Sequence, residues 1–289
     1  FSSFFNLKEN DKFNYICIAP AIGYNLYDKF MIGALIHNYT LPQTKFRFVI
    51  APMYATGSKD ITFIGRMSYS IFGNNGSKTE FAVSGAKFNT DEYTDSTGKK
   101  NYLPFSKIVP TLTYIFPNKN PRSPIVKYIQ WKTFFIQETG LSFTRDTINQ
   151  VNIIRYPSES RYLNQLRFAI ENYRVLYPYD ATIKAEQGKG FIRLDLTANY
   201  FFNYAKDGGL NLRFFAGKFM YTGDKTFLTQ YETDRYHLNL TGPKGYEDYT
   251  YSNYFIGRNE FDGLSNQQIM MRDGGFKVRT DLLSSKTGK

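Results

Sequence analysis

The chain has 289 residues, a formal net charge of +11 and a single cysteine. Hydrophobic residues make up 42% and aromatic residues 18%, which excludes a disordered chain and permits a large core. The lone Cys17 excludes an internal disulfide framework and a cysteine-rich metal site. The longest purely apolar run, 30–36, is far shorter than the roughly 18–20 residues of a membrane-spanning helix, which leaves a membrane β-barrel open.

Polar and apolar residues alternate along much of the chain, as they do in β-strands whose side chains point to two opposite faces. The clearest example is 191–204, where Leu194 and Leu196 share one face while Arg193 and Asp195 share the other. The pattern predicts about eleven strands, with boundaries good to a few residues. In chain order, the alternating segments are 13–24, 29–39, 45–52, 61–72, 79–89, 108–116, 125–139, 162–174, 191–204, 210–221 and 249–261.

The connections between these segments are rich in Gly, Pro, Asn and Asp, which supply the backbone angles of turns. Tight turns are expected at 25–28, 57–60 and 206–209, and longer polar loops at 90–101, 117–124, 144–160 and 222–248. We expect the short turns at one end of an up-and-down sheet and the long loops at the other.

One domain is predicted over 1–289, because no linker divides the chain. No repeat of roughly 20–50 residues occurs, which argues against a propeller or solenoid. Within it, 1–12 is a lead-in segment and 276–289 a tail. The sequence starts at Phe1 and ends in a loop-like stretch, and we expect both ends to be cuts within a longer chain.

Two all-β folds explain such alternation: a soluble sandwich and a membrane barrel. The prediction is an antiparallel up-and-down transmembrane β-barrel, incomplete in this chain, because tyrosines gather toward strand ends, where a membrane interface favours them. These expected interface aromatics are Tyr24, Tyr54, Tyr69, Tyr114, Tyr200, Tyr204 and Tyr221. The opposite face would line the barrel lumen with Arg47, Arg66, Arg167, Glu171, Arg193, Asp195, Asn199 and Arg213. In the soluble alternative, the same charges would face water.

No catalytic or metal-binding motif is found in the chain. His37 and His237 are isolated, and neither H-E-x-x-H nor G-x-S-x-G occurs. His37-Asn38 is similar to the His/Asn pair of barrel phospholipases, but no serine can be placed opposite it. Basic residues are spread along the chain rather than clustered, which favours lumen lining, loop solubility or contact with anionic lipid head groups over nucleic acid. We therefore expect no catalytic residue, metal or cofactor in this chain, and no nucleic-acid partner.

Several long phrases resemble a known family. They are FVIAPMY at 48–54, RYLNQL at 161–166, YRVLYPYD at 173–180 and EDYTYSNYFIGR at 247–258, with shorter ones at 38–42, 57–60, 84–88, 105–110 and 272–276. Together they resemble the C-terminal region of large gluzincin-type metallopeptidases of Gram-negative bacteria, in which an aminopeptidase-like zinc domain precedes a predicted outer-membrane barrel. The resemblance implies an outer-membrane location, a zinc ion in an upstream domain, and further barrel strands beyond position 289.

Three functions follow as hypotheses. The first is a membrane-embedded barrel that anchors a metallopeptidase-like protein and passes or delivers peptides. The second is a transport channel without peptidase activity, biased toward anions by its arginines. The third is a structural subunit of an outer-membrane complex, with loop 222–248 as a docking segment. The expected partners are outer-membrane lipid and other outer-membrane proteins.

Overall fold

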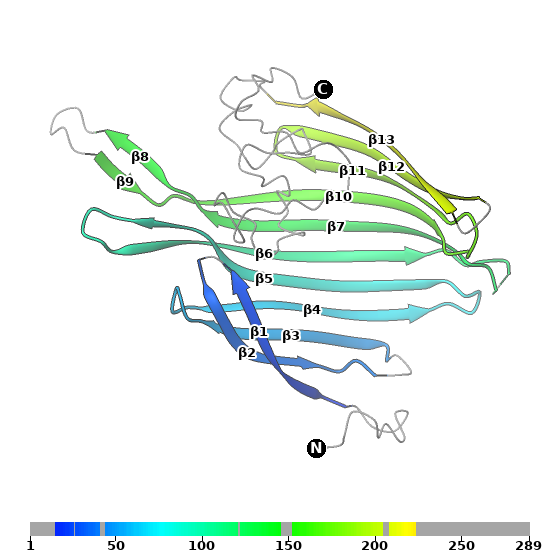
Figure 1. The fold of residues 1–289 in the computed structure, drawn as a ribbon, viewed down its shortest axis with the longest axis horizontal. Helices are drawn as coiled ribbons and strands as arrows, with labels where there is room; N and C mark the ends of the chain where they lie inside the picture. Colours follow the sequence, from blue (N-terminus) through cyan, green and yellow to red (C-terminus); the bar gives the residue numbers. More distant parts are fainter. Residues whose placement is uncertain are drawn as a thin grey trace. The chain divides into compact units, whose positions relative to one another are not determined.

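The computed structural model describes residues 15–25, 27–40, 44–120, 122–145, 152–204 and 208–223. Over these ranges the protein is all-β, with no helix (Figure 1). Eleven antiparallel strands form one sheet in the order β1-β2-β3-β4-β5-β6-β7-β10-β11-β12-β13, and β8 pairs with β9 separately. Because the neighbours follow the chain, every connection in the main sheet joins adjacent strands. None of the described ranges contains a helix that is long and apolar enough to cross a membrane.

The strands of the main sheet are between 9 and 17 residues long. Their bounds are β1 Cys17–Asn25, β2 Lys29–His37, β3 Phe46–Ala55, β4 Ile61–Phe72, β5 Lys78–Thr94, β6 Lys100–Ile115, β7 Ile125–Thr139, β10 Ser158–Asn172, β11 Tyr179–Gly188, β12 Phe191–Tyr204 and β13 Gly208–Tyr221. The short pair is β8 Ser142–Arg145 and β9 Asn152–Arg155. Among the described strands the sheet is not closed, since β1 and β13 are the two ends of the order.

The alternation predicts the main strands well, with one omission. Each alternating segment that falls on described residues corresponds to a strand of the main sheet, whereas 249–261 lies outside them. The missed strand is β11, whose apolar positions include Ala181 and Ala185 instead of large side chains. Small alanines make the alternation faint, although the backbone pairs in regular register with both neighbours.

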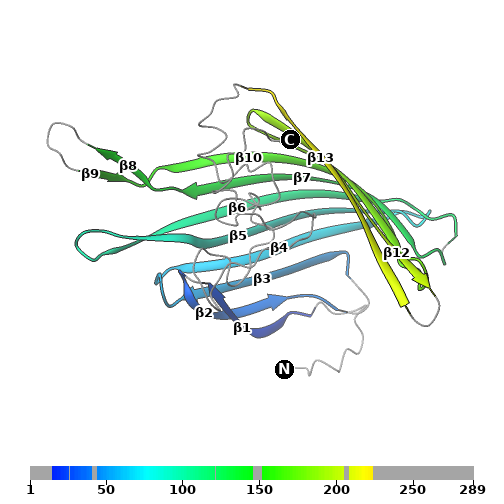
Figure 2. The ribbon, with the colours of Figure 1, turned by 45° about the horizontal axis from the view of Figure 1, so that its top comes forward.

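Two of the expected long loops, 90–101 and 144–160, differ from the structure. The tight turns at 25–28 and 57–60 lie at the same end of the sheet as the tip of the long β5–β6 hairpin. Because β5 ends at Thr94 and β6 begins at Lys100, the expected loop 90–101 is only a short turn. Within the expected loop 144–160, the described residues 144–145, 152–155 and 158–160 are strand, because β8 and β9 pair and continue β7 and β10 (Figure 2). Connection length here follows how far each strand pair extends past its neighbours.

The tip of the β5–β6 hairpin has a clear local cause. Gly98 has a φ of 82°, which a glycine adopts without the penalty that a Cβ brings. The Asp95 carboxylate accepts hydrogen bonds from the backbone N–H groups of Thr97 and Lys99 at 2.9 and 3.0 Å. Turn chemistry therefore fixes the register of the two longest strands.

The chain divides into two compact units, which take different ends of several strands. The first holds residues 1–70, 81–110 and 134–162, and the second holds 71–80, 111–133 and 163–289. In the first unit, a small apolar cluster forms around Met31, Met53 and Ala55, with Ala21 and Phe88 packed against it. The Phe88 ring lies 5.5 Å from the ring of buried Phe105.

Candidate functional site: a sheet with an exposed apolar face

One face of the sheet carries large apolar side chains that are exposed; we call it the apolar face. Across the first four strands, Ile22 pairs with Ile32, Ile32 with Tyr54, and Tyr54 with Ile61. These side chains are 77%, 60%, 53% and 62% exposed, respectively. The register therefore places exposed apolar groups side by side, because residues opposite each other in a ladder share a face.

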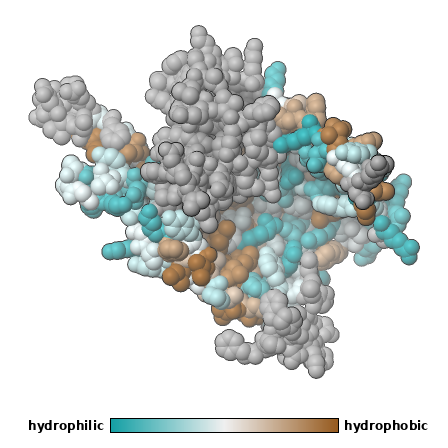
Figure 3. Space-filling view, in the orientation of Figure 1, coloured by the Kyte–Doolittle hydropathy of each residue, from teal (hydrophilic) through white to brown (hydrophobic). Residues whose placement is uncertain are grey.

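The apolar face has the same character in the second unit. Phe168 pairs with Ile183, and Ile183 with Leu196. On the last two strands, Phe202 pairs with Leu210, which is also exposed. Figure 3 shows hydrophobic side chains in brown at the surface, with hydrophilic ones in teal between them. Exposure of large apolar groups is thus a property of the sheet and not of one strand.

The opposite face, which we call the polar face, buries polar side chains together with apolar ones such as Met53, which pairs with Thr62. In the first unit it includes Thr62, Ser68 and Ser70, each at most 5% exposed. Arg47 pairs with Ser68 and Arg66 with Val49, so both arginines lie on this face, half-buried. The Arg47 guanidinium lies 5.9 Å from the centre of the Tyr39 ring.

A buried acid, Asp28, organises the turn end of the first unit. Its carboxylate accepts hydrogen bonds from the Asn25 amide at 2.9 Å and the Ser58 hydroxyl at 2.6 Å. It also accepts one from the backbone N–H of Asn89 at 2.9 Å and one from the Asn89 side-chain amide. Asp28 is fully buried, and these donors come from β1, the β3–β4 turn and β5. The carboxylate therefore ties three hairpins together.

The polar face of the second unit carries a buried ion-pair cluster, formed by Lys184, Glu186, Arg193 and Asp195. Arg193 contacts Glu186 at 3.3 Å and Asp195 at 3.5 Å. Lys184 contacts the same two acids, Glu186 at 3.6 Å and Asp195 at 3.4 Å. The Glu186 and Asp195 side chains are only 3% and 2% exposed, so each charge is compensated in a low-dielectric setting. The Gln165 amide adds a hydrogen bond to Glu186 at 2.7 Å.

A second polar group lies nearer the β10–β11 connection. The Tyr128 hydroxyl donates to Glu171 at 3.2 Å, and the Arg167 guanidinium lies 5.4 Å from the centre of the Tyr128 ring. Asn199 donates to Asp180 at 2.8 Å, and Arg213 pairs in register with Asn199.

On the polar face of β10–β13, the positive and negative side chains of these two groups are equal in number. The cations are Arg167, Lys184, Arg193 and Arg213, and the anions are Glu171, Asp180, Glu186 and Asp195. The sequence pattern identifies only part of this arrangement, since Asp180, Lys184 and Glu186 lie on the unpredicted strand β11. The alternation of Asp180, Thr182, Lys184 and Glu186 is the signal that could have found them. An excess of positive charge is therefore not a property of this part of the face.

Six of the seven tyrosines expected at an interface lie on the apolar face. Tyr24 pairs with Phe30, with ring centres 5.3 Å apart, at the β1–β2 turn end. Tyr69 pairs with Phe46 at the opposite end. The remaining members on this face are Tyr54, Tyr114, Tyr200 and Tyr204, and Tyr114 has its ring centre 5.0 Å from that of Phe116. Tyr221 pairs in register with Phe191, which is on the polar face, and its side chain lies outside the described part of the structure.

Three ionisable groups in the connections have shifted pKa values. A hydrogen bond from Lys87, at 2.7 Å, lowers the pKa of the Asp60 carboxyl, although partial burial opposes it. A hydrogen bond from the Thr97 hydroxyl lowers the pKa of Asp95. The hydrogen bond with Glu171 raises the pKa of the Tyr173 phenol to about 12. All three groups therefore keep their usual charge state at neutral pH.

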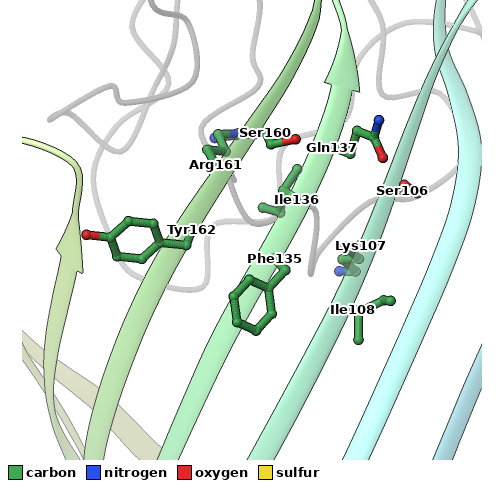
Figure 4. A pocket seen from close by; sticks show the side chains of 9 residues that line it. All are labelled: Ser106, Lys107, Ile108, Phe135, Ile136, Gln137, Ser160, Arg161 and Tyr162. Carbon is green, nitrogen blue, oxygen red and sulfur yellow. The ribbon is translucent and has the colours of Figure 1, made fainter.

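The first unit has a hollow of about 400 Å³ where β6, β7 and β10 run side by side (Figure 4). It is lined by Ser106, Lys107, Ile108, Phe135, Ile136, Gln137, Ser160, Arg161 and Tyr162. Arg161 contacts Glu138 at 3.1 Å, with both side chains about 10% exposed or less. The residue types offer hydroxyl and amide donors beside aromatic rings, and no nucleophile–base pair.

No model of a known protein family matches the chain, and neither a curated protein nor a solved structure is significantly similar to it. Among the residues that the structure describes, no group of three or more His, Cys, Asp or Glu side chains is placed to hold a metal ion.

Proposed function

We propose that this chain forms the membrane-embedded wall of an outer-membrane β-barrel and anchors its parent protein in the lipid. The observation that carries the proposal is the polarity of the sheet: large apolar side chains are exposed on one face, and ionised side chains such as Glu186 and Asp195 are buried on the other. A sheet in water does the reverse, packing its apolar face against a core. A barrel in lipid turns its apolar face outward.

The magnitude of the exposed area supports this choice. Burying one large aliphatic or aromatic side chain is worth about 1.5–3 kcal/mol. Because Ile22, Ile32, Tyr54 and Ile61 are each more than half exposed, this row alone leaves about 4–8 kcal/mol unrealised if the face meets water. Exposed apolar patches of more than a few hundred Å² mark a partner or a membrane, and lipid hydrocarbon is the partner that can cover a whole sheet face.

Strand length also supports a membrane. A tilted strand needs about 9–11 residues to cross the hydrocarbon core. The shortest strands of the sheet, β1 and β2, have 9 residues each, so every strand in the described sheet meets the lower end of this requirement. In the proposed barrel the edges of β1 and β13 are paired by further strands, since an unpaired backbone group in hydrocarbon costs several kcal/mol by rough estimate.

The peptidase link is a further part of the proposal and rests on the resemblance of long phrases such as YRVLYPYD at 173–180. In that setting the barrel holds an upstream zinc peptidase at the outer membrane and passes or delivers peptides. The channel alternative expects the arginines to favour anions. On β10–β13 this bias is not supported, because acidic side chains match the basic ones in number. The complex-subunit alternative depends on 222–248, of which only 222–223 lie within the described ranges.

The single tryptophan provides the test. Trp131 is the only tryptophan of the chain, is 55% exposed and stands near the centre of β7. It lies on the apolar face, because the side chains that alternate with it, such as Tyr128 and Gln130, bond to groups of the polar face. In vesicles of phospholipids brominated along the acyl chain, we expect strong quenching of its fluorescence.

Bromine near the middle of the bilayer should quench more than bromine near the headgroups, and aqueous iodide should quench little. Heat-modifiable gel mobility identifies the folded fraction in the same samples. A folded protein that stays monomeric without detergent, with Trp131 open to iodide and insensitive to bromine, contradicts the proposal.

A further inference from the structure

The hollow on β6, β7 and β10 has an ordered lining. Six of its residues share the apolar face, and on each strand a polar one stands two positions from an apolar one: Ser106 and Ile108, Gln137 and Phe135, Ser160 and Tyr162. In Figure 4 the three polar side chains lie in one half of the hollow and the three apolar ones in the other. Three neighbouring strands thus change from polar to apolar at one level.

The apolar half consists of side chains that are well exposed. Ile108 is 57% exposed, Phe135 53% and Tyr162 44%. Toward the β7–β10 connection, Ser106, Ser160 and Gln137 offer hydroxyl and amide donors, and the Gln137 amide also reaches Ser158 at 3.3 Å. A molecule seated here meets donors at one end and apolar surface at the other.

The polar half has no formal charge on the apolar face. Lys107, Ile136 and Arg161 alternate with the six residues and point to the other face (Figure 4). Arg161 is engaged there by Glu138 at 3.1 Å. Uncharged donors suit a neutral acceptor such as an ester carbonyl, whereas a phosphate would call for Arg or Lys.

We propose that this hollow is a binding site for one phospholipid, whose glycerol ester carbonyls accept hydrogen bonds from Ser106 and Ser160 while an acyl chain lies against Phe135 and Tyr162. The inference rests on the proposed membrane function, because it needs the apolar face to meet lipid. The volume of about 400 Å³ is in the range of small-molecule sites. In a bilayer the lipid ester groups lie between the polar headgroups and the hydrocarbon, which matches a hollow with polar side chains at one end and apolar side chains at the other.

The test compares three folded proteins in detergent, titrated with dioleoylphosphatidylethanolamine, with bound lipid counted by native mass spectrometry. The double variant Ser106→Leu/Ser160→Leu removes both hydroxyls and fills the hollow. The matched control, Ala185→Leu, adds the same side chain to the apolar face outside the hollow. We expect one retained phospholipid in the wild type and control, and about tenfold weaker binding in the double variant, which corresponds to about 1.4 kcal/mol.

If the double variant does not fold, Ser106→Ala/Ser160→Ala removes the donors without adding bulk, and about threefold weaker binding is expected. Equal phospholipid retention by all folded forms overturns the site. Preferential retention of lipopolysaccharide by wild type, lost in the variant, overturns phospholipid as the occupant. Bromolipid quenching of Trp131 in the same preparations separates the two proposals: quenching with equal lipid retention rejects the site alone, and absent quenching rejects the membrane face.

Discussion

A single lysine on the apolar face discriminates between lipid and water as the medium outside the sheet. Ile183 is the fifth of ten residues in β11 and is 55% exposed. A lysine at the bilayer midplane of a membrane barrel costs about 2–4 kcal/mol. For Ile183→Lys we therefore expect a 30- to 1000-fold loss in the folding equilibrium constant, estimated at about tenfold per 1.4 kcal/mol. In water, the same exposed substitution would stay within about 0.5 kcal/mol.

The matched control is Gln187→Lys on the same strand and face. Gln187 lies four residues from Ile183, about 13 Å along the strand, and one residue before the end of β11. Near the interface a lysine costs only about 0–1 kcal/mol. Urea unfolding in phospholipid vesicles, followed by Trp131 fluorescence, gives the midpoint and slope for each variant. Equal small shifts for both lysines would refute the assignment of this face to lipid.

Two further predictions concern the ionised groups. Glu186→Gln leaves the cations of the ion-pair cluster undercompensated and should lower the free energy of unfolding by about 3 kcal/mol. The double variant Glu186→Gln/Arg193→Gln should lose less free energy of unfolding than the sum of the two single variants. Additive losses in the same urea assay would contradict the coupling. The lowered pKa of Asp60 stabilises the folded state above its ordinary pKa near 4, and this stabilisation is lost as the pH falls through the lowered value. The Lys87→Met variant lacks this hydrogen bond. The urea midpoint of the wild type should therefore fall more than that of the variant when the pH is lowered from about 6 to about 3. Parallel pH profiles of the two midpoints would exclude this contribution of Asp60.

Side-chain alternation predicted the sheet because it reports which residues share a face, and this depends only on local backbone geometry. In β12, Leu194 and Asp195 lie on opposite faces as the period of two requires. Alternation failed at β11, where Ala181 and Ala185 carry too little apolar surface to mark their face. It also says nothing about how far a strand extends, so the ends of β5 and β6 were missed.

The partners of each polar group could not be predicted, because they depend on register between strands. The sequence offers Arg193 and Asp195 as lining residues, but their pairing with Lys184 and Glu186 follows from the β11–β12 ladder. Asp28 gave no signal beyond a turn residue, since its partner Asn89 is 61 positions away. The hollow likewise needs three strands in register before its two halves meet.

The buried Asp28 carboxylate has a consequence for the order of assembly. All of its donors lie between Asn25 and Asn89, so the contact is complete once the first five strands have formed. Closing that span costs only slowly growing loop entropy, and the regular hairpins shorten it further. The N-terminal hairpins can therefore reach their final contacts before β10–β13 pair with the sheet. Each later strand then adds to an edge that is already formed, by local steps of low contact order.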